Sequence, residues 1–409
     1  MSSLAGRRII LGVSGSVAAY KAVDLASRLT QQGALVDAVL TAAATRFVSA
    51  LTFRSVTGRT AHADLWSEEA HVLHVGLGHG ADVLVVAPAT ADVLAKLAHG
   101  LADDLLTVTA LAAPGPLVLC PAMDAGMWDH PATRANVQTL RSRGAIFIGP
   151  DEGRMASGLA GPGRFVEPEE IVERLRTVLG ANGALAGRTV VVSAGPTREP
   201  VDPVRFVGNR SSGRQGFAIA RAALDRGARV VLVAGPTDLR TPAGAVRLDV
   251  TTAAEMHAEV LAAAAKADAL VMAAAVADFA PETPADAKLK KGSRDRLTLR
   301  LAPTADILAA VAARRRKTKR PSVLVGFAAE TGDPASEARR KLAAKGLDLV
   351  VANDVTAPGA GFEGETNLVV LFGADGTEEK LPLMSKDDVA EAVMDRVAHR
   401  LASGPGRGR

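Results

Sequence analysis

The sequence has 409 residues, of which 48% are hydrophobic and 22% charged, with one cysteine and a net charge of +4. These values predict a soluble chain with two large cores and exclude a disordered, collagen-like or disulfide-stapled protein. No apolar run reaches the roughly 20 residues that a membrane helix needs. The single Cys120 indicates a reducing compartment, so we expect a cytoplasmic protein with no membrane partner. Aromatic residues make up only 3%, too few for nucleic-acid stacking, which favours phosphate-bearing small molecules over nucleic acid.

The first half alternates between buried strands and amphipathic helices. A strand over residues 8–13 ends at Ser14-Gly15-Ser16, and the helix after it stops at Gly33. Strands separated by helices need right-handed crossovers, which predicts a mostly parallel sheet covered on both faces. The other predicted strands are 35–40, 83–87, 117–120 and 146–148, and the other predicted helices lie near 90–98, 102–113 and 131–143.

The alternation starts again after residues 181–187, where Leu185-Ala186-Gly187-Arg188 resembles the opening of the chain. We therefore expect an α/β protein with two doubly wound Rossmann-like domains, 1–183 and 184–402. The tail 403–409 has nothing to bury and is expected to be disordered. Predicted strands of the second domain are 189–193, 229–234, 269–275, 323–327, 348–352 and 367–372. Its predicted helices are 213–226, 253–265, 304–315, 335–344 and 386–401.

Ligands in such sheets bind beyond the carboxyl ends of the strands, and three strand ends of the first half have suitable residues. Gly12-Val-Ser-Gly15-Ser16 lets amides approach a phosphate, although a tight turn with no ligand is the alternative. The spacing differs from the dinucleotide fingerprint and Thr41 replaces its acidic residue, so a mononucleotide fits better than NAD. Residues 87–92 and 121–128 leave room for a flat ring. His74 is either a base facing this pocket or a structural histidine.

In the second half, a long loop over residues 194–213 ends in Ser-Ser-Gly at a helix start, which again offers amides to phosphate. The strand end 272–279 leaves room for a base or ribose, and Asp278 is placed to accept hydrogen bonds. Lys288 and Lys290 follow in a charged run that reads equally as a solvated surface. If that run is extended, both lysines lie on one face and concentrate positive charge for a triphosphate.

These motifs resemble two known families joined in one chain. The segments GSVAAYK, APATAD, ADDLL and PAMDAGMW look like the flavin-containing cysteine decarboxylases, and the sequence from 187 onward looks like phosphopantothenate-cysteine ligase. In this order they resemble the bifunctional bacterial coenzyme A biosynthesis proteins. The resemblance implies a flavodoxin-like flavin domain followed by a nucleotide-binding ligase domain.

For the first half, the resemblance implies FMN and the decarboxylation of 4'-phosphopantothenoylcysteine to 4'-phosphopantetheine. A flavin supplies the electron sink that this reaction needs, because a carboxylate beta to a thiol is lost reluctantly. His74 matches the family's catalytic histidine and is expected to assist thiol oxidation. The residues expected at FMN are Gly15, Ser16, Thr41, Ala87, Pro88, Thr90 and Met123.

Two expected catalytic residues depart from the family's pattern. Asp124 replaces an asparagine, and its carboxylate would repel the substrate carboxylate unless it is protonated or bonded to a cation. Ser157 lies in the mobile flap 153–164 and replaces the family's cysteine, which protonates the enethiolate. An alcohol is a far weaker acid than a thiol. Either Ser157 acts with a bound water, another acid replaces it, or product release is altered. We expect the remaining thiol, Cys120, to be structural.

For the second half, the resemblance implies ligation of 4'-phosphopantothenate with L-cysteine through an acyl-cytidylate made from CTP. Mg²⁺ would neutralise the triphosphate, held mostly by phosphate oxygens and water. Asn209 is expected to orient or stabilise the acyl carbonyl, and Lys288 to act in nucleotide activation. The other residues expected at CTP are Ala275, Asp278, Lys290, Ala305, Asp306, Ile307, Leu308, Phe327, Lys341 and Lys345.

Two further classes of protein remain as alternatives. A dinucleotide-dependent oxidoreductase is disfavoured by the missing fingerprint. A nonenzymatic flavoprotein scaffold, or an active ligase fused to a flavin-binding half with altered decarboxylase activity, would account for Asp124 and Ser157. The families imply decarboxylase trimers and ligase dimers, so we expect a homo-oligomer, and a dodecamer would combine both symmetries. The loop 358–366 is expected at a site edge or a dimer contact.

Overall fold

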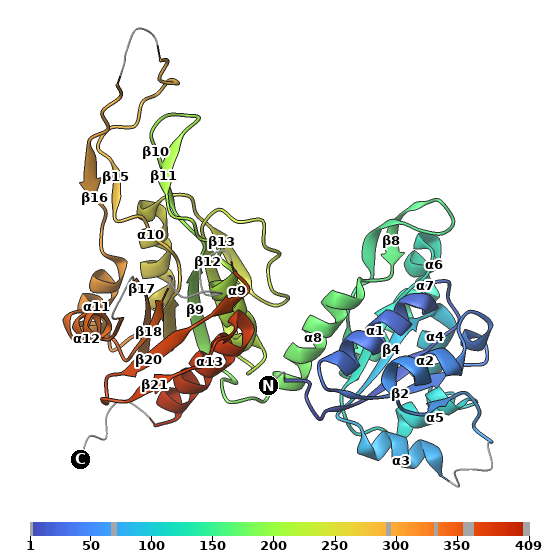
Figure 1. Ribbon diagram of the computed structural model, residues 1–409. Coiled ribbons are helices and arrows are strands. Elements are labelled where there is room, and N and C mark those ends of the chain that lie inside the picture. The colour runs from blue at the N-terminus through green and yellow to red at the C-terminus, as the bar shows by residue number, and fades with distance from the viewer. Residues whose placement is uncertain (1–2, 67–71, 292–295, 331–333, 355–363, 404–409) are drawn as a thin grey trace. The chain divides into compact units, whose positions relative to one another are not determined.

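The computed structural model describes residues 3–66, 72–291, 296–330, 334–354 and 364–403. The chain divides into two compact units, Met1–Leu179 and Gly180–Arg409 (Figure 1). Among the described residues, no helix is both long and apolar enough to cross a membrane. The predicted tail, most of the loop 358–366 and part of the basic run after Lys288 lie outside the described residues.

The first unit contains a parallel sheet with strand order β3-β2-β1-β4-β5-β6, as the alternating pattern predicted. The order reverses between β1 and β4, which is the switch point where doubly wound folds bind ligands. Its strands are β1 Arg8–Val13, β2 Leu35–Leu40, β3 Ala61–His62, β4 Val83–Ala89, β5 Leu117–Pro121 and β6 Ile146–Phe147, with a separate hairpin of β7 Asp151–Arg154 and β8 Ala160–Arg164. Its helices are α1 Ala19–Gln31, α2 Ala50–Thr57, α3 Leu73–Gly80, α4 Ala91–His99, α5 Leu105–Ala112, α6 Ala125–Asp129, α7 Pro131–Ser142 and α8 Pro168–Gly180, with a 3-10 turn at Ala44–Arg46.

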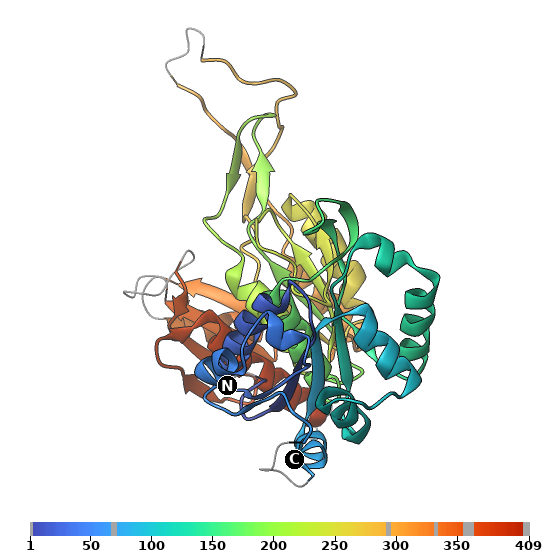
Figure 2. The same ribbon diagram turned by 90° about the vertical axis from the view of Figure 1, so that its right-hand side faces the viewer.

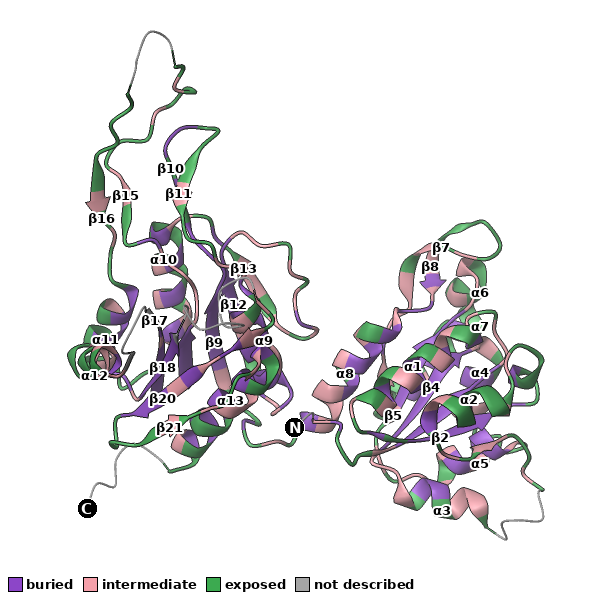
Figure 3. Cartoon of the chain, in the orientation of Figure 1, coloured by how far each residue is buried: buried purple, intermediate pink, exposed green. Residues whose placement is uncertain are grey.

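Helices cover both faces of this sheet, and the central strands are buried along their length (Figure 3). Alternate residues of a strand point to opposite faces. Ile9 and Leu11 of β1 therefore pack with α1, α2 and α8, whereas Ile10 between them packs with α4, α5 and α7. The near-continuous apolar strands of the sequence are explained by this two-sided cover.

The second unit has an eight-stranded sheet in the order β13-β12-β9-β14-β17-β18-β20-β21, parallel from β13 to β18 and antiparallel at β20 and β21. Its sheet strands are β9 Thr189–Ala194, β12 Arg229–Ala234, β13 Val246–Asp249, β14 Ala269–Met272, β17 Val323–Glu330, β18 Leu349–Asp354, β20 Val369–Gly373 and β21 Glu378–Lys380. Three two-stranded ribbons are formed by β10 Arg198–Pro200 with β11 Phe206–Gly208, β15 Phe279–Pro281 with β16 Leu301–Pro303, and β19 Thr366–Asn367 with β22 Met384–Ser385. Its helices are α9 Arg214–Leu224, α10 Ala253–Ala264, α11 Ile307–Thr318, α12 Pro334–Lys345 and α13 Lys386–Ser403.

The two faces of the second sheet are covered by different sets of helices. α9 and α13 pack on one face around Val192 and Val325, and α10, α11 and α12 pack on the other around Val191 and Leu324. The predicted strand 269–275 is too long, because β14 ends at Met272. Beyond it the chain crosses toward β9, where Ser193 Oγ accepts from the amide of residue 274 at 3.2 Å.

Two ribbons project from the same end of the second sheet (Figure 2). β10 and β15 contact each other, and Asp202, between β10 and β11, ties the two ribbons together. Its carboxylate accepts from the amides of Val204 and Leu289 at 2.9 and 3.0 Å and from the Arg205 guanidinium at 2.6 Å. The lysine run beside Leu289 lies outside the helices and strands, and Lys288 and Lys290 are exposed on it.

Candidate functional site

The carboxyl ends of β1 and β4 meet at the switch point of the first sheet, where a buried hydroxyl joins them. Ser14 Oγ donates to Pro88 O at 2.7 Å and accepts from Thr90 N at 3.1 Å. Ser14 was not among the predicted residues, although a serine directly after a buried strand at a switch point is a usable signal. It fixes the loop that carries Pro88 and Thr90, two of the residues expected at the flavin.

The turn after β1 is shaped for close approach of the backbone. A Cβ on Gly15 would lie 2.5 Å from the Cβ of Ala43, so glycine lets this turn pack on the loop after β2. Thr41, buried at the end of β2, hydrogen-bonds to the short turn that follows it. α1 has no side-chain N-cap, which leaves amides at its start for a ligand phosphate or water. Small residues and helix-start amides along one edge fit a flavin phosphate and ring.

The β7–β8 hairpin is fastened to the loop after β5. Met123 N donates to Gly163 O at 3.0 Å, and a Cβ on Gly163 would lie 2.3 Å from Met123 O. At the hairpin tip, Ser157 Oγ donates to Asp124 Oδ2 at 2.6 Å, and Gly126 N donates to Asp124 Oδ1. These two hydrogen bonds hold the pKa of Asp124 below its usual value. The two residues that depart from the family's pattern are therefore one hydrogen-bonded pair, with Asp124 ionised at neutral pH.

His74 and Cys120 lie apart from this pair. α3, which carries His74, lies at the side of the unit opposite to α6 and β8 (Figure 1). The structure therefore does not bring His74 to the flap residues of its own unit. Cys120 is fully buried in β5, and burial raises the pKa of its thiol. A thiol in such surroundings stays protonated and unreactive.

The second unit holds a cavity of about 380 Å³ at the carboxyl ends of β14 and β17, beside the start of α9. It brings together five predicted residues from separate segments of the chain. They are Asn209, Ala275, Asp278, Phe327 and Lys341. Residues 211–216 form another part of the wall. The cavity therefore joins Asn209, the residues at the start of α9 and the cation of Lys341 in one space.

Hydrogen bonds to the backbone hold two of these side chains. Asn209 Nδ2 donates to Ala275 O and Val276 O, both at 3.2 Å. A substrate carbonyl would have to replace one of these acceptors to receive a hydrogen bond from the Asn209 amide. Lys341 Nζ donates to Phe327 O at 2.9 Å, which positions its charge at the cavity wall.

Asp306 and Lys345 form an ion pair of 2.8 Å between the N-cap of α11 and the end of α12. Burial alone would raise the pKa of Asp306, but hydrogen bonds from Lys345 and the Ala309 amide outweigh it and lower the pKa. Asp306 and Lys345 do not line the cavity, whereas Lys341, one turn earlier on α12, does. The pair therefore links two helices next to a cavity residue.

Five other residues predicted to bind CTP are not brought to the cavity wall. Ile307 and Leu308 pack in the apolar core with α10, so only their backbone is available to a nucleotide. Ala305 is exposed. Lys288 and Lys290 are exposed on the irregular segment that is tied to Asp202. The structure thus separates the lysine run from the cavity that it was expected to complete.

Four polar residues of the cavity were missed by sequence reasoning. Gln215, Asn353, Asn367 and Lys386 come from α9, β18, β19 and α13 and lie side by side in the cavity wall. Lys386 is only 6% exposed. Nothing in the sequence marks it, because a lysine at the start of an amphipathic helix reads as a solvated residue.

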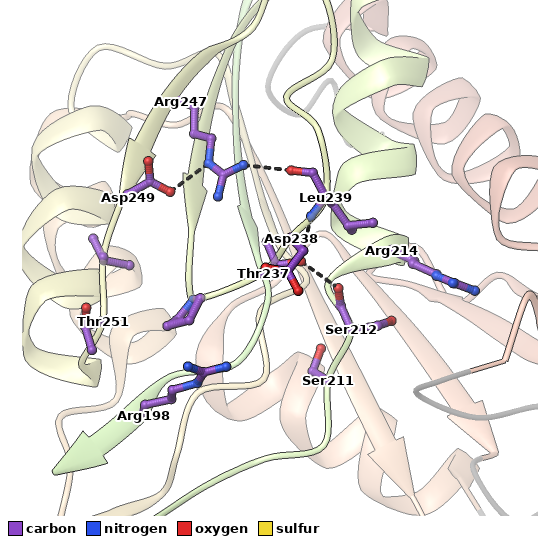
Figure 4. Close-up of a pocket in the computed structure, with 12 residues that line it drawn as sticks. Arg198, Ser211, Ser212, Arg214, Thr237, Asp238, Leu239, Arg247, Asp249 and Thr251 are labelled. Carbon is purple, nitrogen blue, oxygen red and sulfur yellow. Dashed lines mark hydrogen bonds and ion pairs between the residues drawn. The ribbon is translucent and has the colours of Figure 1, made fainter. Parts of the chain in front are cut away.

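A second cavity, of about 690 Å³, shares three of its lining residues with the first (Figure 4). The shared residues are Ser211, Ser212 and Arg214, which form the segment between the two spaces. Across this second cavity, Arg247 donates to Asp249 at 2.7 Å, so its charge is already paired. One stretch of backbone before α9 therefore forms a wall of both cavities.

Comparisons with known proteins follow the same division. A family model described as Flavoprotein matches residues 1–180, and one described as DNA/pantothenate metabolism flavoprotein C-terminal domain matches residues 185–401. The chain is 45% identical over 400 residues to the coenzyme A biosynthesis bifunctional protein CoaBC of Bacillus subtilis (strain 168), covering 97% of each chain.

Two solved structures are similar to one half each. The C-terminal domain of a coenzyme A biosynthesis bifunctional protein CoaBC has 34% identity and a TM-score of 0.46, covering 54% of this chain and 99% of that one. A PPC decarboxylase mutant complexed with pantothenoylaminoethenethiol has 36% identity and a TM-score of 0.39, covering 42% of this chain and 97% of that one.

Proposed function

The chain belongs to the family of bifunctional coenzyme A biosynthesis proteins, and on that premise we propose which nucleotide, which flavin and which residues it uses. Its first half is a flavin-containing decarboxylase and its second half is a ligase. Their substrates are related to pantothenate and cysteine. The proposals below concern what this family membership leaves open.

For the ligase, we propose that CTP activates 4'-phosphopantothenate. An ionised carboxylate is a poor acyl donor. One carboxylate oxygen therefore bonds to the α-phosphorus, while the bond from that phosphorus to the bridging oxygen breaks and pyrophosphate leaves with the electron pair. The amine of L-cysteine then forms the amide bond to the acyl carbon, loses a proton to solvent and expels CMP.

One observation carries this proposal. The cavity of the second unit places Asn209, the start of α9 and Lys341 around one space. Amides at a helix start and a lysine suit phosphates, and Asn209 suits a carbonyl on which charge develops. Asp278 lines the same space and would accept hydrogen bonds from the nucleoside. We infer that Mg²⁺ enters with CTP, held by phosphate oxygens and water.

For the decarboxylase, we propose that FMN lies at the switch point, with its phosphate near Gly15 and Ser16 at the start of α1. Thr41 would lie beside it at the end of β2. Bound there, FMN would supply the reversible electron acceptor that the decarboxylation needs. The other residues that would contact the ring are Ala87, Pro88, Thr90 and Met123.

We propose that Ser157 delivers a proton to the substrate with the help of a bound water. Asp124 accepts a hydrogen bond of 2.6 Å from the Ser157 hydroxyl and so orients it. Because its pKa is lowered, Asp124 is ionised and does not itself supply the proton. Asp124 would also repel the substrate carboxylate and so favour its loss as neutral carbon dioxide.

One incubation tests both halves. Purified protein should be yellow, and 4'-phosphopantothenate, L-cysteine, CTP and Mg²⁺ should yield CMP, pyrophosphate and carbon dioxide in equal amounts. Replacement of CTP by ATP should abolish nucleotide cleavage or reduce it strongly. Equal rates with ATP would overturn the choice of CTP, and 4'-phosphopantothenoylcysteine that accumulates without carbon dioxide would overturn the proposed roles of Asp124 and Ser157.

We also propose that the protein is a homo-oligomer, with trimer contacts in the first unit and dimer contacts in the second. Tyr20 on α1 is 63% exposed and Leu51 on α2 is 70% exposed, and these two helices contact each other. Exposed apolar side chains on adjoining helices suit an interface between copies. Since α3 lies away from the flap of its own unit, His74 would serve the flavin site of a neighbouring copy.

A further inference from the structure

Three polar side chains and one backbone carbonyl form a connected row in the wall of the ligase cavity. Asn353 Nδ2 donates to Asn367 Oδ1 at 3.5 Å, and Asn367 Nδ2 donates to Gln215 Oε1 at 2.7 Å. Gln215 Nε2 then donates to Lys386 O at 3.0 Å. The row joins α9 to the first residue of α13, so the position of Lys386 is fixed relative to the start of α9.

The charge of Lys386 lies where a cation is costly. The side chain is buried and opens an 18-residue helix, whose N-terminal end disfavours positive charge. Arg214 lies close enough to repel it, and burial together with this repulsion lowers the pKa of Lys386. Both cations line the cavity with the amides at the start of α9. Lys386 is buried, whereas Arg214 is exposed and lies 3.9 Å from the carboxylate of Glu365. An anion between the two cations and the helix start would reduce their repulsion.

A second observation also indicates a ligand in this cavity. Asn353 is 8% exposed, and its Oδ1 has no hydrogen-bond partner among the described residues. The hydrogen bonds of the row fix the orientation of the Asn353 amide, because its nitrogen must point toward Asn367 Oδ1. A buried acceptor without a donor is costly. Water on a phosphate-bound cation would supply the missing donor.

We propose that Lys386, with Arg214 and the start of α9, binds the β- and γ-phosphates of the nucleoside triphosphate and retains them as the departing pyrophosphate. This inference rests on the proposed nucleotide-dependent ligase reaction and assigns one of its subsites. Lys386 stabilises the negative charge that develops on the bridging oxygen as its bond to the α-phosphorus breaks. It therefore acts in carboxylate activation and not in the attack of the cysteine amine.

Replacement of Lys386 by an uncharged side chain of similar length tests the inference. Lys386→Met removes the buried cation and keeps a side chain of similar length. Its affinity for magnesium pyrophosphate, measured by calorimetry, should fall on the order of tenfold. A lysine with only a structural role would lower Tm and leave the affinity of the folded protein for magnesium pyrophosphate unchanged.

Arg221→Met is the matched control. Arg221 pairs with Asp387 at 3.5 Å across the same junction between α9 and α13, but it does not line the cavity. It should leave the pyrophosphate affinity unchanged, and Lys386→Arg should restore most of the affinity lost in Lys386→Met. The KM for CTP should rise in Lys386→Met while the KM for L-cysteine stays constant.

Two results would overturn the inference. One is equal pyrophosphate affinity in Lys386→Met and the unsubstituted protein, and the other is no measurable binding of magnesium pyrophosphate to the unsubstituted protein. Failure of the ligase proposal itself has a different signature, since the unsubstituted protein would then release no pyrophosphate from CTP. The calorimetric comparison of the variants does not depend on that turnover.

Discussion

If Ser157 delivers the proton as proposed, the rate of the decarboxylase half should depend on its acidity. Its hydroxyl is a much weaker acid than a thiol and already donates a hydrogen bond to Asp124. Ser157→Cys should therefore speed the protonation step, on the order of tenfold. A single-turnover measurement of product formation from 4'-phosphopantothenoylcysteine checks this. Ser157→Ala should slow the same step and leave CMP release unchanged. A slower Ser157→Cys variant would exclude the hydroxyl as the proton route.

Cys120 should not react with thiol reagents in the folded protein. Burial keeps the thiol protonated, and the thiolate is the reactive form. Titration with a chromogenic disulfide should detect no thiol in the native chain and one after denaturation. Cys120→Ala should lower the free energy of unfolding by about 1 kcal/mol through lost packing. Rapid labelling of the native protein would contradict this account.

At the scale of elements, Asp202 should control how firmly the two ribbons of the second unit hold together. Burial would raise its pKa, but hydrogen bonds from Arg205 and three backbone amides outweigh this and hold the pKa well below the usual range. Because the pKa of Asp202 is lower in the folded than in the unfolded state, its ionised carboxylate stabilises the fold above about pH 4. This stabilisation is lost as the pH falls through the pKa of Asp202 in the folded state. Acid should therefore loosen the ribbons before the sheet unfolds.

Hydrogen exchange of the backbone amides checks this prediction. In Asp202→Asn at pH 7, the amides of Val204 and Leu289 should exchange faster than in the unsubstituted protein. Asp286→Asn, a change to an exposed residue of the same segment, is the control and should leave exchange unaltered. Equal exchange in both variants would show that the carboxylate does not hold the ribbons.

The long strands and helices could be predicted from sequence, and the ribbons could not. β1, β4 and β9 are apolar runs buried on both faces, so their composition alone identifies them. β10 and β15 have only three residues each, are rich in proline or charge and have no alternating pattern. Their pairing depends on contacts such as those of Asp202, which local sequence does not encode.

The candidate site divides in the same way. Residues directly after predicted strands could be located from sequence because the position of a strand end follows from the strand, and two of them, Ala275 and Asp278, line the cavity. Lys288 was expected at the nucleotide because it matches the ligase family's lysine motif, but it is exposed and is not part of this cavity wall. Lys386 was missed because its burial results from the packing of α13 on α9, which only the tertiary structure reveals.

At the scale of the whole molecule, the two units have separate apolar cores and should fold separately. Leu175 packs in the core of the first unit and Leu185 in that of the second. Gly180 approaches the backbone of Asp225, where an added Cβ would lie 2.0 Å from the carbonyl oxygen. The segment from Gly180 onward therefore belongs with the second unit.

Fragments test this division. A chain of residues 180–409 should retain ligase activity, and residues 1–179 should bind flavin. A ligase fragment that starts at residue 188 should be less stable than one that starts at 180, because it lacks the contacts of Leu185 and Gly180. Thermal unfolding of each fragment provides the comparison. Loss of all structure in both ligase fragments would show that the units depend on each other.

The segment from Ser211 to Arg214 forms a wall of both cavities in the second unit. A ligand that shifts this segment on entering one cavity would also change the wall of the other, since Ser211, Ser212 and Arg214 line both. The resulting free energy of coupling is reciprocal. If a ligand in the larger cavity changes the affinity of the smaller cavity for its ligand, the second ligand changes the affinity for the first by the same factor. A ligand in the second cavity would then act on the cavity that contains Asn209 through this short stretch of backbone.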